Sequence, residues 1–148
     1  MLYAPPQMKD TADNYFWPGA GCRTREGNTD YVAGSVYLPD TWAGTTVIVD
    51  VLGIPNAGSG GSAYGSIDLE YGLWAWDGYG ALGDNSGWAQ SASLDSADSM
   101  YILATYTTTD GDMSAGMWLG IKYGRQGGHA SDTYGDDVWV KGFRITLL

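Results

Sequence analysis

Residues that could catalyse hydrolysis are few and stand apart in this sequence. Nucleophilic catalysis needs a nucleophile, a base within hydrogen-bonding reach and an acid that orients the base. The only histidine is His129, which follows two glycines, and no serine or cysteine stands out as its partner. A histidine flanked by glycine is typical of an exposed loop, so we expect no catalytic residues and no enzyme.

Several aspartates near the C-terminal end could instead serve a metal ion. Calcium is bound by carboxylates and carbonyls that converge from one loop. Asp132 could converge with Asp136 and Asp137, and Asp110 with Asp112, although neither set has the spacing of an EF-hand loop. Aspartate is also common in turns, where its side chain bonds the nearby backbone. We therefore expect no cofactor and no metal site, with calcium as the alternative.

Aromatic side chains are the richest source of binding chemistry, with seven tryptophans and eleven tyrosines. Rings on a protein surface stack on sugars and anchor protein interfaces. Trp74, Trp76 and Trp118 fall in expected strands, where packing in the core is the simpler interpretation. Trp42 and Trp88 fall in expected loops, so these two are the candidates for exposed aromatic contacts.

The charge balance excludes several classes of partner. The 148 residues carry a net charge of −10, with only seven basic side chains that form no cluster. Nucleic acids and anionic membrane surfaces attract clustered Lys and Arg, so we expect neither as a partner. No apolar run reaches the roughly 18 residues of a membrane span, and the N-terminus lacks the features of a signal peptide. The lone cysteine, Cys22, leaves no internal disulfide and fits assembly in a reducing cytoplasm.

The pattern of apolar residues is that of β-strands throughout. Residues 45–52 are rich in β-branched side chains, and apolar residues alternate with polar or small ones over residues 66–73 and 117–123. The alternation changes phase beside Gly72, which predicts a β-bulge or a sharp bend there. Residues 77–93 are either a long loop or a short pair of strands. With helical periodicity nearly absent and turn signals between strands, we predict a single all-β domain, a jelly-roll β-sandwich.

The first 13 residues differ from the rest of the chain. They are polar, and Pro5 and Pro6 fix an extended stretch that is poor in hydrogen bonds. We therefore expect an extended N-terminal arm at residues 1–13 and the sandwich domain at residues 14–148. Tyr3, Pro5, Pro6 and Met8 are the residues through which such an arm would dock on a partner.

Several stretches of the sequence resemble two known families. Residues 130–143 hold Ala-Ser-Asp-Thr-Tyr, two further aspartates and a closing apolar strand with Gly142, and they resemble the end of jelly-roll virion proteins of tailed bacteriophages. Residues 117–123 and residues 38–52 resemble the strand before that loop and the early turn and strand of the same proteins. Separately, residues 66–70 are similar to the catalytic strand of family-16 jelly-roll glycanases, but Ser66 stands where that motif carries its nucleophile.

The virion resemblance implies a non-enzymatic structural protein. Because the chain has a short arm and no heptads for a fibre shaft, we expect a homotrimeric capsid decoration (cement) protein of the virion, whose arm docks on the major capsid protein. The alternative is a receptor-binding or carbohydrate-binding knob of a head or tail fibre, with Trp42 and Trp88 as its platforms. A degenerate glycanase is the third interpretation.

Overall fold

The regular structure of the described residues is entirely β. The computed structural model describes residues 1–8, 16–17, 21–72, 81–109 and 111–148. The strands are β1 (Leu2–Ala4), β2 (Gln7–Met8), β3 (Phe16–Trp17), β4 (Gly21–Thr24), β5 (Thr29–Tyr37), β6 (Val47–Pro55), β7 (Tyr64–Gly72), β8 (Ala81–Gln90), β9 (Tyr101–Thr108), β10 (Trp118–Gln126) and β11 (Val138–Leu147). Over the same residues, no helix has the length and apolar character that crossing a membrane requires.

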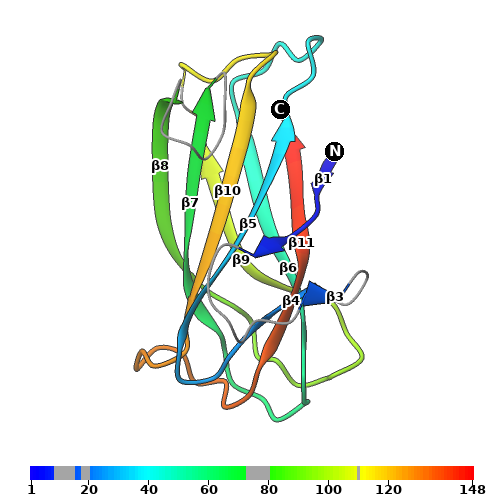
Figure 1. Cartoon of the computed structure of the whole chain (residues 1–148), viewed down its shortest axis with the longest axis vertical. Helices are drawn as coiled ribbons and strands as arrows, with labels where there is room; N and C mark the ends of the chain where they lie inside the picture. The colour runs from blue at the N-terminus through cyan, green and yellow to red at the C-terminus, as the bar shows by residue number, and fades with distance from the viewer. Residues whose placement is uncertain (9–15, 18–20, 73–80, 110) are drawn as a thin grey trace.

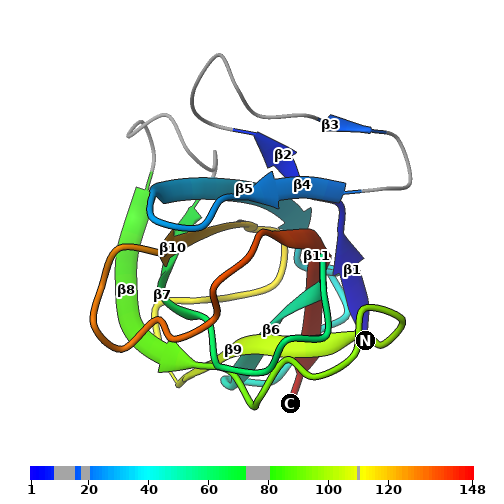
Figure 2. The same cartoon turned by 90° about the horizontal axis from the view of Figure 1, so that it is seen from below.

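The strands form two antiparallel sheets that face one another (Figures 1 and 2). The first sheet, sheet A, has the order β3-β4-β11-β6-β9, and β1 pairs with the same edge of β11 as β4 does. The second, sheet B, has the order β2-β5-β10-β7-β8. Apart from β3-β4 and β7-β8, neighbouring strands are not consecutive in the sequence, as in a Greek-key sandwich. The prediction of an all-β jelly-roll sandwich is confirmed.

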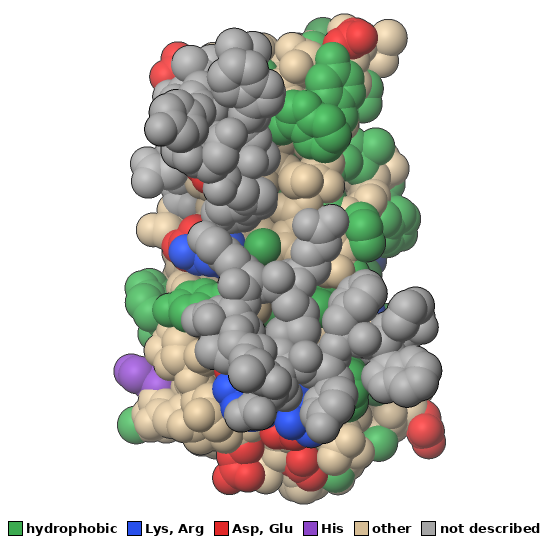
Figure 3. Space-filling view, viewed as in Figure 1, with side chains coloured by type: hydrophobic (Ala, Val, Ile, Leu, Met, Phe, Trp, Pro, Cys, Tyr) green, Lys and Arg blue, Asp and Glu red, His purple; other side chains and the backbone are tan. Residues whose placement is uncertain are grey.

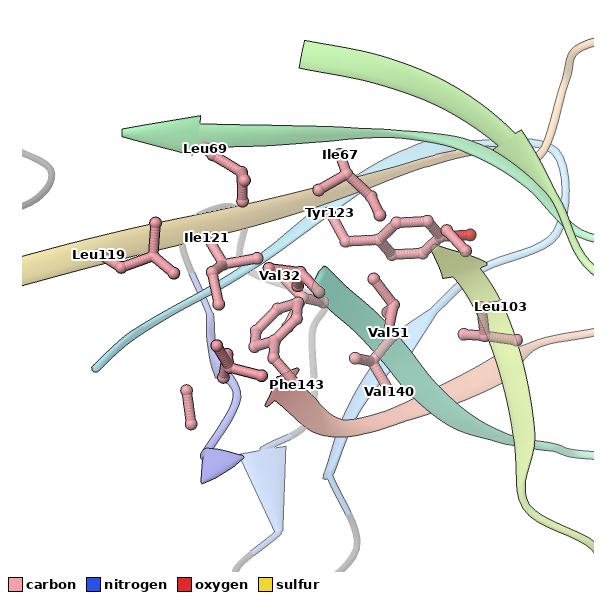
Figure 4. Packing of buried hydrophobic residues seen from close by; sticks show 14 of the residues in the cluster. Val32, Val51, Ile67, Leu69, Leu103, Leu119, Ile121, Tyr123, Val140 and Phe143 are labelled. Carbon is pink, nitrogen blue, oxygen red and sulfur yellow. The ribbon is translucent and has the colours of Figure 1, made fainter. Parts of the chain in front are cut away.

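The core lies between the two sheets. Because side chains alternate across a strand, every second residue of the long strands points inward. Figure 4 shows apolar side chains of both sheets packed together, and they include Val32, Val51, Ile67, Leu69, Leu103, Leu119, Ile121, Tyr123, Val140 and Phe143. Cys22 is fully buried near them, and burial raises the pKa of its thiol to about 11, so it behaves as a small apolar residue.

The tryptophans contribute less to this core than the sequence suggests. Trp74 and Trp76 lie outside the described residues. The side chain of Trp118, interpreted from the sequence as core, is 40% exposed and meets the ring of Tyr37 edge-on, with 5.6 Å between centroids. Its neighbours along β10, Leu119 and Ile121, take the inward positions instead. Trp118 therefore lies on the outer face of sheet B.

The region after β7 also differs from expectation. The predicted irregularity beside Gly72 is confirmed, because the pairing of β7 with β8 shifts register between Tyr71 and Gly72. The segment that we expected to be a loop or a short strand pair instead contains one long strand, β8. Its sequence is rich in small and polar residues, so its extended conformation depends on pairing with β7 rather than on intrinsic preference. Trp88 consequently stands on a strand and not in a loop.

The first eight residues are part of the sandwich, which corrects the prediction of a free arm. Leu2–Ala4 pairs with β11, and Gln7–Met8 pairs with β5, so the segment crosses from one sheet to the other. Gly142 makes this possible, since a Cβ there would lie 2.9 Å from the carbonyl oxygen of Ala4. Sheet edges offer unpaired backbone groups, and the N-terminal segment pairs with such groups on both sheets.

The side chains proposed for docking are divided by this arrangement. Pro6 is buried, whereas Pro5 is exposed and Tyr3 is 64% exposed. Met8 is placed through its backbone pairing with Val32. Residues 9–13 of the expected arm lie outside the described residues. Contact of this segment with another protein stays a prediction.

Candidate functional site

A buried ion pair fixes the loop between β10 and β11. Arg125 ends the inward row of β10, and its side chain is 0% exposed. Its Nε and Nη2 donate to the two carboxylate oxygens of Asp132, both at 2.9 Å. Its remaining N–H groups donate to the backbone carbonyls of Thr24, Asp136 and Tyr134 at 3.2, 2.7 and 2.8 Å. All five donors of the guanidinium are thus satisfied, which offsets the cost of burying the charge.

The other aspartates of this loop also have structural partners. Asp137 accepts a hydrogen bond from the backbone N–H of Glu26 at 2.9 Å and lies 3.5 Å from Arg23. Asp136 accepts from the side-chain amide of Asn56 at 3.2 Å. Figure 3 shows acidic and basic side chains together at this lower end of the molecule. The loop aspartates therefore hold the sandwich end together.

This chemistry argues against the calcium alternative. Both oxygens of Asp132 face Arg125, and one of them also accepts from the backbone N–H of Tyr64 at 3.0 Å. Three hydrogen bonds and the positive charge of Arg125 therefore already engage this carboxylate, which disfavours binding of a further cation. Among the described residues, no group of three or more His, Cys, Asp or Glu side chains could hold a metal ion. Asp110, of the second pair considered, lies outside them.

Tyr134 completes the anchoring of the loop. Its ring is buried, and its hydroxyl donates to the carbonyl of Ala57 at 2.6 Å while accepting from the N–H of the same residue at 3.0 Å. Burial is the main cause that raises the pKa of this phenol. The Ala-Ser-Asp-Thr-Tyr stretch is thus bound by its aspartate to β10 and by its tyrosine to the loop after β6.

The anchored loop carries His129 to an aromatic stack. Trp88 of β8 lies parallel to Tyr64 of β7, with 5.4 Å between ring centroids and 11° between planes. The ring of His129 also stacks on Tyr64, with 4.6 Å between centroids and 25° between planes. Trp88 is 63% exposed, so the indole has one ring face supported by Tyr64 and much of its surface open. Figure 3 shows hydrophobic side chains above the histidine at the left margin of the molecule.

Trp88 also ends a row that crosses sheet B. Four residues on adjacent strands stand in register on its outer face: Tyr31 of β5, Gly124 of β10, Ser66 of β7 and Trp88 of β8. The ring of Tyr31 lies over Gly124, because a Cβ at that glycine would be 2.6 Å from Tyr31 Cε1. The row therefore has aromatic rings toward its two ends and small residues between them.

Polar groups border this row on both sides. On one side, Lys122 Nζ lies 3.0 Å from Asp68 Oδ2 and 5.4 Å from the centroid of the Tyr31 ring. On the other side, Thr29 donates to the side-chain oxygen of Gln126 at 3.0 Å. On that same side, Gln90 donates to the carbonyl of Ser131 at 2.9 Å. We call the row and its two polar borders the aromatic face.

The structure separates the two predicted aromatic contacts. Trp88 is exposed as expected and belongs to the aromatic face. Trp42 is not an exposed platform, since its ring packs against the core and its indole N–H is buried with no hydrogen-bond partner. Trp42 lies in the turn after β5, where its backbone N–H donates to the carbonyl of Pro39 at 2.9 Å.

The enzymatic interpretations find no support in the geometry. His129 is exposed, and its Nδ1 accepts a hydrogen bond from the backbone of Ser131 at 3.1 Å, within its own loop. In the stretch similar to glycanases, Ser66 is 8% exposed, and Asp68 is engaged by Lys122. The polar side of β7 is thus a binding surface or a solvated face.

Comparison with known proteins gives likenesses of fold only. No protein-family model matches the chain, and no curated protein matches it. Among solved structures, the mannan-recognising carbohydrate-binding module TmCBM27 is 12% identical, with 95% of this chain and 87% of that chain covered and a TM-score of 0.44. The xylan-binding module CBM15 is 12% identical, covering 99% and 91%, with a TM-score of 0.43. The CBM36-1 domain of a xylanase from the hindgut metagenome of Trinervitermes trinervoides is 18% identical, covering 97% and 90%, with a TM-score of 0.40.

At these identities and TM-scores, what those modules bind is a property of those proteins. The function of this chain has to be argued from its own residues.

Proposed function

We propose that this chain is a non-catalytic carbohydrate-binding protein that holds its ligand on the aromatic face of sheet B. One observation carries the proposal: Trp88, 63% exposed, is held flat against Tyr64 on a β-sheet. An exposed indole leaves apolar surface in contact with water, which is unfavourable for the free protein. Its fixed orientation is what a stacking ligand requires.

The chemistry around the ring suits a sugar. The C–H face of a pyranose packs on an indole, while its hydroxyl groups need hydrogen-bond donors and acceptors at the sides. Lys122, Asp68 and Gln90 lie beside the row and supply both kinds of group. The net charge of −10 disfavours an anionic ligand, so a neutral glycan is the better match.

The virion location stays a prediction, and the structure changes which version of it has support. The decoration-protein version relied on a free docking arm, and residues 1–8 are instead paired with β11 and β5. The knob version needs a rigid surface that recognises a receptor glycan. The aromatic face is such a surface, so glycan binding by a fibre knob is compatible with this proposal.

Binding to a glycan array, followed by calorimetry on the hits, tests the proposal. Trp88→Ala should weaken binding about tenfold or more, since loss of an aromatic anchor costs on the order of 2 kcal/mol. Trp118→Ala is the matched control. Its ring is 40% exposed on the same outer face, but it stands at the start of β10, away from the aromatic row. An array of neutral glycans without a hit, or a Trp88→Ala variant that binds as well as the wild type, would overturn the proposal.

A further inference from the structure

We infer that the ligand is a linear, neutral oligosaccharide that lies across the strands of sheet B, from Trp88 to Tyr31. The inference rests on the proposed function and adds the length, shape and direction of the bound chain. It depends on the order of the strands, which brings these two rings into one row.

The spacing of the row sets the length of the ligand. Trp88 and Tyr31 stand on β8 and β5, with β7 and β10 between them. Adjacent strands are about 4.8 Å apart, and the Tyr31 ring leans over β10, so two to three spacings, on the order of 10–14 Å, separate the rings. A pyranose unit advances an extended glycan chain by roughly one such strand spacing. A chain of three or four units therefore reaches from one ring to the other, whereas a monosaccharide contacts only one.

The middle of the row is built from small residues. Ser66 and Gly124 stand between Trp88 and Tyr31 on the paired strands, and both are buried. Gly124 allows the ring of Tyr31 to lie flat over it, because an added Cβ would press on two atoms of that ring at 2.6 and 2.8 Å. We therefore expect an interior sugar to pass above these buried residues while its neighbours stack on Trp88 and Tyr31.

The polar borders select an unbranched chain. The Lys122–Asp68 pair lies along one side of the row, and Gln126 with Thr29 and Gln90 lies along the other. These borders run in the same direction as the row, so they meet the hydroxyl groups on both edges of an extended chain. A branch at an interior sugar would collide with one border.

A chain-length series tests the inference. The probes are neutral β-1,4-linked gluco-, manno-, xylo- and galacto-oligosaccharides of one to six units, titrated by calorimetry into the full chain. We expect the affinity of the bound series to rise steeply up to three or four units and then to level off. Tyr31→Ala should lower affinity for the longest probe about tenfold and leave mono- and disaccharide binding unchanged, whereas Trp88→Ala should weaken every length.

Two further variants separate stacking from folding. Tyr31→Phe keeps the ring and should bind like the wild type. Gly124→Ala should weaken binding of the long probes as Tyr31→Ala does, because the added methyl displaces the ring. Far-ultraviolet circular dichroism and thermal unfolding of each variant check that the sandwich is intact.

The outcomes that overturn the inference differ from those that overturn the proposed function. Equal affinity for one and six units, or a Tyr31→Ala variant that binds hexasaccharide like the wild type while Trp88→Ala does not, would show a single-sugar site and leave glycan binding standing. Absence of binding across every series would overturn the inference together with the role of Trp88.

Discussion

Arg125 and Asp132 form a two-point ion pair with both side chains 0% exposed, and this pair joins the aromatic face to the loop that supports it. Arg125 directly follows Gly124, the floor of the aromatic row. Asp132 lies three residues after His129, which covers one face of Tyr64. The arrangement of the stacked rings therefore depends on a buried ion pair that lies outside the aromatic face.

Removing one partner of this pair should be severely destabilising. In Arg125→Met the Asp132 carboxylate stays buried without its counter-charge, and three backbone carbonyls lose their donor. We expect a loss of about 3–5 kcal/mol in the free energy of unfolding. Asp132→Asn keeps one acceptor but removes the negative charge and leaves the guanidinium of Arg125 buried without its counter-charge, so we expect a loss of similar size. Urea unfolding followed by tryptophan fluorescence measures both, and a small loss in Asp132→Asn would show that the hydrogen bonds and not the charge pair hold the loop.

Tyr64 should matter for binding through the side chains that stack on its ring, Trp88 and His129. The Tyr64→Ala variant removes the support of Trp88 and the contact with His129. A stacked aromatic pair is worth about 0.5–1.5 kcal/mol, so affinity for glycan should fall roughly three- to tenfold. Tyr64→Phe keeps the stack and is the control. Calorimetry with the same oligosaccharides decides the point, and an unchanged affinity in Tyr64→Ala would show that Trp88 holds its orientation alone.

The long central strands were predictable from sequence because burial on one face imposes alternation. Residues 45–52 and 117–123 became β6 and β10 on that ground. β8 was not recognised, since an edge strand with one covered side tolerates glycine, asparagine and serine. The two short N-terminal strands were missed because backbone pairing at a sheet edge leaves no pattern in two or three residues.

The candidate site was predictable only in part. Trp88 was named from its residue type, but Tyr31 and Tyr64 were not. Alternation places Tyr64 on the polar side of β7, which was the available signal. The alignment of Tyr31 with Trp88 depends on the strand order β5-β10-β7-β8, and that order joins segments far apart in the chain. Trp42 was misassigned because a turn can direct a ring into the core as readily as out of it.

Gly61 should tolerate alanine poorly, for two separable reasons. Its φ is +94°, and an added Cβ would collide with the carbonyl oxygen of Thr133 and lie 2.8 Å from the carbonyl carbon. Gly27, with φ of +71° and nothing within 4 Å of such a Cβ, is the matched control. Gly27→Ala should cost about 1–2 kcal/mol for its backbone conformation alone. Gly61→Ala should cost on the order of 2 kcal/mol more through the collision.

Urea unfolding of the two glycine variants gives the comparison directly. Because Ser62 and Thr133 exchange hydrogen bonds of 2.9 and 3.0 Å beside Gly61, the collision separates two segments that anchor the loop of Asp132. Equal destabilisation of the two variants would mean that the loop moves aside without cost.

Asp30 should make the stability of the protein depend on acid pH. Its carboxylate is 2% exposed and accepts from the N–H, Nε and Nη2 of Arg25 at 2.7, 3.0 and 2.8 Å. Burial acts to raise the pKa of this group, but the hydrogen bonds and charge of Arg25, with the charge of Arg23, together hold the pKa below its ordinary value of 3.8. The folded state therefore favours the ionised carboxylate more than the unfolded chain does.

The direction of the pH dependence follows from that difference. The contribution of Asp30 is fully present above the ordinary value of 3.8, and it is lost as the pH falls through the lower pKa of the folded state. Asp30→Asn should therefore be less stable than the wild type at pH 7, and the gap should narrow below about pH 4 and close at still lower pH. Urea unfolding at half-unit steps from pH 2 to pH 7 measures the gap. A gap that stays constant over this range would show that Asp30 acts through its hydrogen bonds alone, which asparagine partly retains, and that its charge contributes nothing to the fold beside Tyr31.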